Sequence, residues 1–183
     1  MCQVINELKG LSAKDLLRKG GQLTSLPVNI AQICYSLNIR KLAVDFFALE
    51  NKENLKINVQ KKGNISGAVI VKGSDVAILY QEQTPLIRRR ATVAHELAHC
   101  CLHMELNERI HFNYKYDKFF QAEKEIEISE FMSELLVPEE ILKQIICKTK
   151  VITQLEFLLL TSAFMVSKNM LESRLSALGI TVF

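Results

Sequence analysis

The segment His95-Glu96-Leu97-Ala98-His99 constrains the fold of this chain more than any other feature. On an α-helix, where each residue advances by about 100°, its two histidines lie only about 40° apart and one turn along the axis. Both imidazoles can therefore reach one ion. The apolar residues around them fall on the opposite side of the helix: Val93, Ala94, Leu97, Ala98, Cys101 and Met104. The sequence predicts a helix whose apolar side packs in the core and whose opposite side carries the two histidines.

This pattern is typical of catalytic zinc. Such a site needs two neutral imidazoles, a third protein ligand, an open position for water and a carboxylate close to that water. His95 and His99 supply the imidazoles, and Glu96 lies at the edge of the same helical sector, where a general base belongs. The alternative is a surface helix that carries the same motif without a metal. A suitable third ligand would favour zinc.

The third ligand has two candidates. His103 lies about 12 Å along the helix axis from His95, too far to share an ion at a Zn–N distance of about 2.1 Å. We expect His103 to make a local hydrogen bond, to support a ligand, or simply to end the helix. Glu125 falls on the apolar side of an expected helix over 121–136, where a carboxylate must be paired, protonated or metal-bound. Pairing of Glu125 with a lysine or arginine is the alternative.

The other glutamates near Glu125 are expected to face water rather than the apolar side of the helix. The other glutamates of this helix gather on the side that faces water: Glu123, Glu127, Glu130 and Glu134. Ser129, one turn after Glu125, shares its side and is placed to hydrogen-bond a ligating histidine.

The order of the expected elements predicts an α+β fold. A helix at about 12–19, with Ser12 and Asp15 as a capping box, and a second helix that begins at Pro27 come first. Three or four antiparallel strands are expected next, at 42–46, 55–59, 65–71 and 76–80. Helices are expected at about 86–104, 121–136, 138–148, 151–160 and 167–177. The strand 68–71 or 77–80 is a candidate edge strand for binding an extended substrate.

Composition and charge narrow the class of protein. With 183 residues, 49% hydrophobic and 23% charged, the chain has the composition of one globular domain or two small lobes. The net charge of +3 attracts phosphate only weakly, and its densest basic cluster, Arg88-Arg89-Arg90, is interpreted as a solvated helix start. Neither a signal peptide nor an apolar run of about 18 residues is present. Five cysteines without CxxC spacing fit a reducing compartment, so we expect a cytoplasmic protein with no membrane partner.

Five segments resemble the ImmA/IrrE family of metallopeptidases. In the family's order they are LPVNIAQICYSLNI at 26–39, ISGAVIVKG at 65–73, RRRATVAHELAHCCLH at 88–103, EIEISEFMSELLVP at 125–138 and FMVSKNMLESRLSALGI at 164–180. Ala98 stands where the family usually has Gly, and Ser129 where it usually has Asn or Asp. The resemblance implies a zincin-like domain of the reduced gluzincin type over 1–148. A helical, helix-turn-helix-like extension over 149–183 would pack on it.

The resemblance also implies a zinc-dependent endopeptidase. His95, His99 and Glu125 would be the ligands of one Zn²⁺ ion, and Glu96 the general base. In the implied reaction Glu96 takes a proton from the zinc-activated water and returns it to the leaving amine.

A further donor is needed for the oxyanion of the tetrahedral intermediate. His111, Tyr114 and Tyr116 are candidates by position alone, in an expected loop between the two zinc helices. The alternative is that this loop packs its phenylalanines onto the core.

The implied partner is a helix-turn-helix transcriptional repressor of a bacterium, phage or mobile element, whose cleavage would relieve repression. One alternative is a non-catalytic regulatory protein that uses the same scaffold to bind a repressor or DNA, and another is a toxin–antitoxin component. The C-terminal helices offer Lys168, Asn169 and Arg174 among apolar residues. For these helices we favour structural packing over direct DNA binding.

Overall fold

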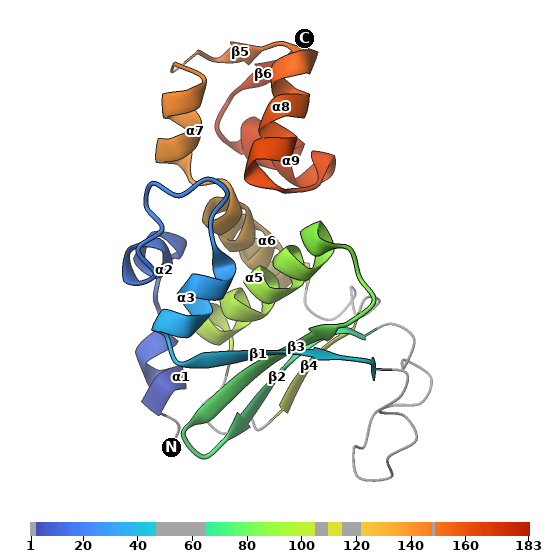
Figure 1. Ribbon diagram of the computed structural model, residues 1–183. Coiled ribbons are helices and arrows are strands. Elements are labelled where there is room, and N and C mark those ends of the chain that lie inside the picture. The colour runs from blue at the N-terminus through green and yellow to red at the C-terminus, as the bar shows by residue number, and fades with distance from the viewer. Residues whose placement is uncertain (1–2, 47–64, 105–109, 115–121, 148) are drawn as a thin grey trace.

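The computed structural model describes residues 3–46, 65–104, 110–114, 122–147 and 149–183, and confirms the α+β class. Figure 1 shows helices α3, α5 and α6 on one side of a small sheet, with the C-terminal elements gathered at the end of the molecule away from that sheet. The elements are α1 (Gln3–Leu8), α2 (Ala13–Lys19), α3 (Ile30–Ser36), β1 (Ile39–Val44), β2 (Ile65–Lys72), β3 (Asp75–Gln81), α5 (Leu86–Leu102), β4 (Ile110–Tyr114), α6 (Ala122–Leu136), α7 (Glu139–Ile145), β5 (Val151–Ile152), α8 (Gln154–Phe164), α9 (Lys168–Ala177) and β6 (Thr181–Val182).

The sheet is mixed, with strand order β1-β3-β2-β4. Strand β1 runs parallel to β3, whereas β2 is antiparallel to both β3 and β4. The expectation of a purely antiparallel sheet is therefore wrong. Only β2 and β3 are joined by a tight turn, at Gly73 with φ of 64°, and such a turn forces antiparallel pairing. No tight turn joins β1 to β3, so turn geometry does not require these two strands to be antiparallel.

Strand β4 occupies part of the segment that was expected to be a loop. Its backbone pairs with β2 from Ile70↔Ile110 to Ile65↔Tyr114. Aromatic and β-branched residues favour extended pairing wherever an unpaired strand is within reach. Among the described strands, β1 and β4 lie at the edges of this sheet, so the interpretation of 68–71 or 77–80 as an edge strand is wrong. The strand expected at 55–59 lies outside the described residues.

Helix starts follow the capping side chains. The Ser12–Asp15 capping box before α2 is confirmed. The prediction that Pro27 begins the next helix is wrong, because the side chain of Asn29 accepts from the backbone N–H of Gln32 and α3 begins at Ile30. Helix α8 likewise begins after the cap at Thr153 rather than at 151, because residues 151–152 form β5 and pair with β6. Helix α1 was not expected from the sequence.

One buried apolar cluster extends from the sheet through α5 and α6 to α8 and α9. All six apolar residues expected behind the histidines are at most 4% exposed. Helix α6 packs against α5, α2 and α9.

None of the described helices is long and apolar enough to cross a bilayer.

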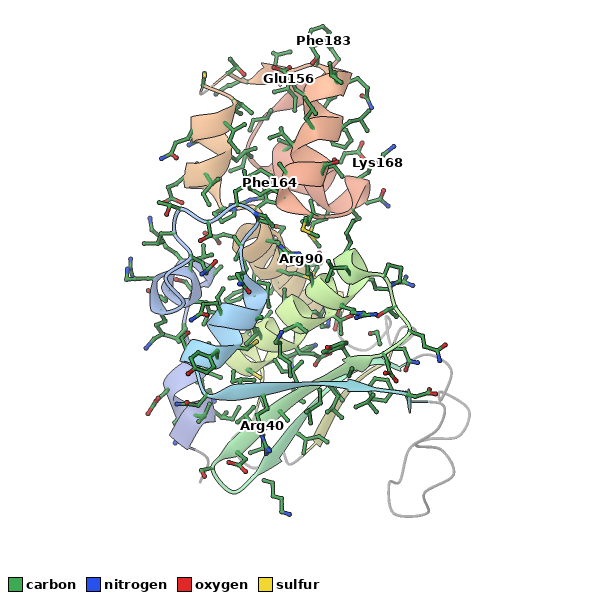
Figure 2. All side chains as sticks on the ribbon, in the orientation of Figure 1. Arg40, Arg90, Glu156, Phe164, Lys168 and Phe183 are labelled. Atoms are coloured by element: carbon green, nitrogen blue, oxygen red, sulfur yellow. The ribbon has the colours of Figure 1, made fainter. Side chains whose placement is uncertain are left out.

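Arg90 joins three parts of the chain. Its Nη1 donates to the carbonyl of Val28 at 2.8 Å and its Nη2 to that of Phe164 at 3.4 Å. Figure 2 labels Arg90 and Phe164 where the C-terminal elements approach α5 and α6. Burial lowers the pKa of the Arg90 guanidinium. The interpretation of the arginine cluster as a solvated helix start therefore holds for the exposed Arg88. It is wrong for the half-buried Arg90, whose guanidinium donates to two main-chain carbonyls.

Candidate metal centre

Helix α5 brings the two histidines of the motif together. The Nε2 atoms of His95 and His99 lie 3.0 Å apart, and their rings meet edge to face with centroids 4.7 Å apart. Their side chains are 16% and 4% exposed, respectively. The buried apolar back of α5 holds the helix in place, so both rings point away from the core side that carries Leu97 and Ala98.

Helix α6 adds Glu125 to the pair. Its Oε2 lies 3.8 Å from His95 Nε2, and its Oε1 lies 3.9 Å from His99 Nε2. One ligand atom from each of the three residues lies within 4.8 Å of the others. Among the described residues, no lysine or arginine forms an ion pair with Glu125. The structure thus favours the metal interpretation of this carboxylate over pairing with a cationic side chain.

The helical-wheel assignment of α6 also agrees with the structure. The side chain of Glu125 is 39% exposed and the residue is half-buried. The glutamates assigned to the water side are all exposed: Glu123, Glu127, Glu130 and Glu134. Burial raises the pKa of Glu125, and the charge of His103 opposes this shift. A cation beside the carboxylate would favour its ionised form.

The donor set fits one divalent ion. In a tetrahedral zinc site, donors that each lie about 2.1 Å from the ion are separated by roughly 3.4 Å. The two imidazole nitrogens lie 3.0 Å apart, and with one Glu125 oxygen they form a group in which all the donor atoms lie within 4.8 Å of one another. Two imidazole nitrogens and one carboxylate oxygen are also the ligand types of catalytic zinc sites that keep a fourth position open.

Glu96 lies on the same turn of α5 but is fully buried, with 0% exposure. Its carboxylate packs against β2. A Cβ atom added to Gly67 would lie only 2.6 Å from Glu96 Oε1 and 2.6 Å from Thr92 Cγ2. The carboxylate is therefore enclosed between α5 and the main chain of the sheet.

Comparison with known protein families identifies this arrangement. The family model of the IrrE N-terminal-like domain, Peptidase_M78, matches residues 55–176. The chain belongs to this family. The match spans α5 and α6 and thus all three residues of the triad. It gives the chain the scaffold of a zincin-like peptidase and confirms the resemblance found in the sequence. No curated protein matches the chain.

His103 of this IrrE N-terminal-like chain lies outside the triad. It ends α5, and its backbone N–H donates to the carbonyl of His99 at 3.0 Å. Its Nε2 lies 3.3 Å from Glu127 Oε2, and its ring centroid is 6.3 Å from that of His99. The contact with Glu127 joins the end of α5 to α6, and a supporting role of His103 at the metal centre stays a prediction. Ser129 is exposed, and its support of a ligand stays a prediction.

Two of the three oxyanion candidates lie in a described strand, and the third does not. His111 and Tyr114 belong to β4, where their backbones pair with Val69 and Ile65 of β2. Tyr116 lies outside the described residues. The oxyanion role of all three stays a prediction.

Sequence reasoning missed Gly67. The signal was present, because a glycine inside an expected buried strand often marks the close approach of another group to the backbone.

The division of this family member into domains at residue 148 stays a prediction.

Proposed function

We propose that this chain is a zinc-dependent endopeptidase in which His95, His99 and Glu125 hold the ion and Glu96 is the general base. The observation that carries the proposal is the convergence of two imidazole nitrogens and one carboxylate from two helices within 4.8 Å. The buried carboxylate of Glu96 on the turn between the histidines supplies the second feature that peptide hydrolysis needs.

A zinc ion bound here would polarise the scissile carbonyl and make a nearby water easier to deprotonate. Glu96 accepts that proton on a carboxylate oxygen and later donates it to the leaving amine. Its burial excludes bulk water from the carboxylate and limits proton exchange to groups inside the site. The packed helices α5 and α6 fix the ring and carboxylate directions before substrate arrives.

We propose a helix-turn-helix repressor as the substrate and the relief of repression as the outcome. The support is the resemblance of five segments to the ImmA/IrrE family, together with the family match. We propose that the C-terminal helices pack on the rest of the chain rather than read DNA. Arg174 Nε donates to the carbonyl of Val137 at 3.2 Å and so holds α9 against the end of α6, while Lys168 and Asn169 are exposed.

The test uses the purified chain and, as the candidate substrate, a purified helix-turn-helix repressor. We expect about one zinc per chain by elemental analysis, cleavage of the repressor, loss of cleavage with a chelator and recovery with added zinc. Glu96→Gln should keep the metal and abolish cleavage, because the amide cannot accept the proton. Cleavage by Glu96→Gln at the wild-type rate would refute the mechanism.

A further inference from the structure

Gly67 lies in the middle of the sheet. On β2 it pairs with Tyr80 of β3 on one side and with Asn113 of β4 on the other, next to an irregularity in the register between Ile65 and Gly67. The residue is buried. A glycine is unfavourable inside a strand, because it gains no side-chain packing and loses the most backbone entropy on folding. Its presence at a central position indicates that something requires the space of a side chain.

The group that fills this space is Glu96. An ideal Cβ on Gly67 would lie 2.6 Å from Glu96 Oε1 and 3.2 Å from its Cδ. Thr92 Cγ2, one turn earlier on α5, would lie equally close, at 2.6 Å. Separations this short do not occur between real atoms of this kind, so any side chain at position 67 would displace the carboxylate or the threonine methyl.

We propose that Gly67 is a positioning residue for Glu96. The bare main chain of β2 forms the wall against which the carboxylate rests, so the strand as well as the helix fixes where the general base presents its oxygens. A glutamate side chain has three rotatable bonds, and a misplacement of about 1 Å at a reacting group lowers the rate by roughly 100-fold. This inference rests on the proposed function, because a positioned base has a purpose only if Glu96 transfers a proton.

The alternative is that Gly67 serves packing alone. A packing glycine affects the stability of the fold, whereas a positioning glycine also affects kcat of folded, zinc-loaded protein. Two experiments distinguish a packing role from a positioning role. One measures how far the effects of Gly67 and Glu96 variants on Tm depend on each other, and the other measures kcat.

The stability measurement is a cycle of Gly67→Ala, Glu96→Ala and the double variant, in the full chain with zinc present. Gly67→Ala should lower Tm by roughly 3–10 °C through overpacking. In the Glu96→Ala background the same change should lower Tm by less, because the displaced carboxylate is gone and only the contact with the Thr92 methyl group remains. If Gly67→Ala lowers Tm equally in the wild-type and Glu96→Ala backgrounds, the contact between position 67 and Glu96 is refuted. It is refuted as well if Thr92→Ser by itself removes the loss of Tm. Should Gly67→Ala fail to fold, the cycle is measured in a Thr92→Ser background, where recovery of folding by Glu96→Ala supports the contact and failure there overturns it.

The kinetic measurement compares Gly67→Ala with wild type on the cleaved repressor. We expect kcat to fall by roughly 10- to 100-fold, with KM and zinc content unchanged. The Glu96→Asp variant offers a rescue, since its shorter side chain leaves room for the new methyl group. Gly67→Ala should therefore reduce kcat less in the Glu96→Asp background than in wild type. A kcat for Gly67→Ala equal to that of wild type would refute the positioning role.

Gly20 provides a matched control. A Cβ there would lie 2.5 Å from Ile33 Cγ1, a crowding similar to that at Gly67, at the end of α2 rather than beside Glu96. Gly20→Ala should lower Tm while leaving kcat at the wild-type value. An equal fall of kcat in both variants would overturn the proposal. A wild-type chain that cleaves nothing refutes the proposed function itself, and the Tm cycle still reports whether the contact exists.

Discussion

Glu125 Oε2 lies 3.8 Å from His95 Nε2, although the two residues belong to different helices. This separation is longer than the roughly 2.7–3.2 Å of a hydrogen bond. It suits two ligands that share an ion between them. The relative placement of α5 and α6 therefore sets the size of the candidate metal centre.

Removal of the carboxylate ligand should weaken zinc binding. Changes in groups that only support zinc ligands lower metal affinity by about 10- to 100-fold, so we expect Glu125→Ala to lower it by at least about 100-fold. Competition with a chromogenic chelator measures the affinity. Glu130→Ala on the exposed side of the same helix is the control and should bind zinc normally. Unchanged affinity in Glu125→Ala would remove this residue from the site.

Zinc should stabilise the fold. A ligand at 100 times its Kd adds about 2.7 kcal/mol to the free energy of unfolding, which corresponds to roughly 5–10 °C in Tm for a chain of this size. Differential scanning fluorimetry with zinc and with chelator measures the shift. His99→Ala should abolish it, because His99 Nε2 faces both His95 and Glu125. A full zinc-induced shift in His99→Ala would place the metal elsewhere.

Arg90 should contribute to stability through its two carbonyl contacts. Arg90→Met leaves the carbonyls of Val28 and Phe164 without their donor, and we expect a loss of about 2–3 kcal/mol in the free energy of unfolding. Urea denaturation measures this loss. Arg88→Met, at an exposed position of the same cluster, should change stability by less than about 0.5 kcal/mol. Equal effects of the two changes would contradict the structural role of Arg90.

Arg174 and Lys168 should separate packing from DNA binding. Arg174→Met should destabilise the chain by about 1–2 kcal/mol, because it removes the donor to Val137, whereas Lys168→Ala at an exposed site should leave stability unchanged. Neither the wild type nor Lys168→Ala should shift a DNA fragment at low salt. A salt-dependent shift that Lys168→Ala abolishes would instead support a DNA-binding regulator.

The buried cysteines should be inert in the folded chain. Burial raises the pKa of Cys34 and that of Cys101 to about 12 in each case. It also raises the pKa of Cys100 well above its ordinary value. At pH 8 these thiols stay protonated and enclosed, so they do not attack a disulfide reagent. In a Cys2→Ser variant, we expect only the exposed Cys147 to react under native conditions and the other three thiols to react after denaturation. Rapid reaction of more than one thiol in the native chain would contradict this burial.

Features with a helical period could be predicted from the sequence. The convergence of His95 and His99, the burial of the residues behind them and the distinct side of Glu125 on α6 all follow from 3.6 residues per turn. The Ser12 capping box is local in the same sense, since its partners are three residues apart.

Only the tertiary structure decided which distant segments meet. Four features each join parts of the chain that are far apart in sequence: the parallel pairing of β1 with β3, the strand at 110–114, the carbonyl contacts of Arg90 and the enclosure of Glu96 by Gly67. Local propensity carries no information about such pairs, because their energy depends on how the whole core packs. The sequence by itself determined the ligand types and their spacing on each helix. Packing of α5 against α6 and β2 decided that the three candidate ligands meet at one centre and that the carboxylate of Glu96 lies against the main chain at Gly67.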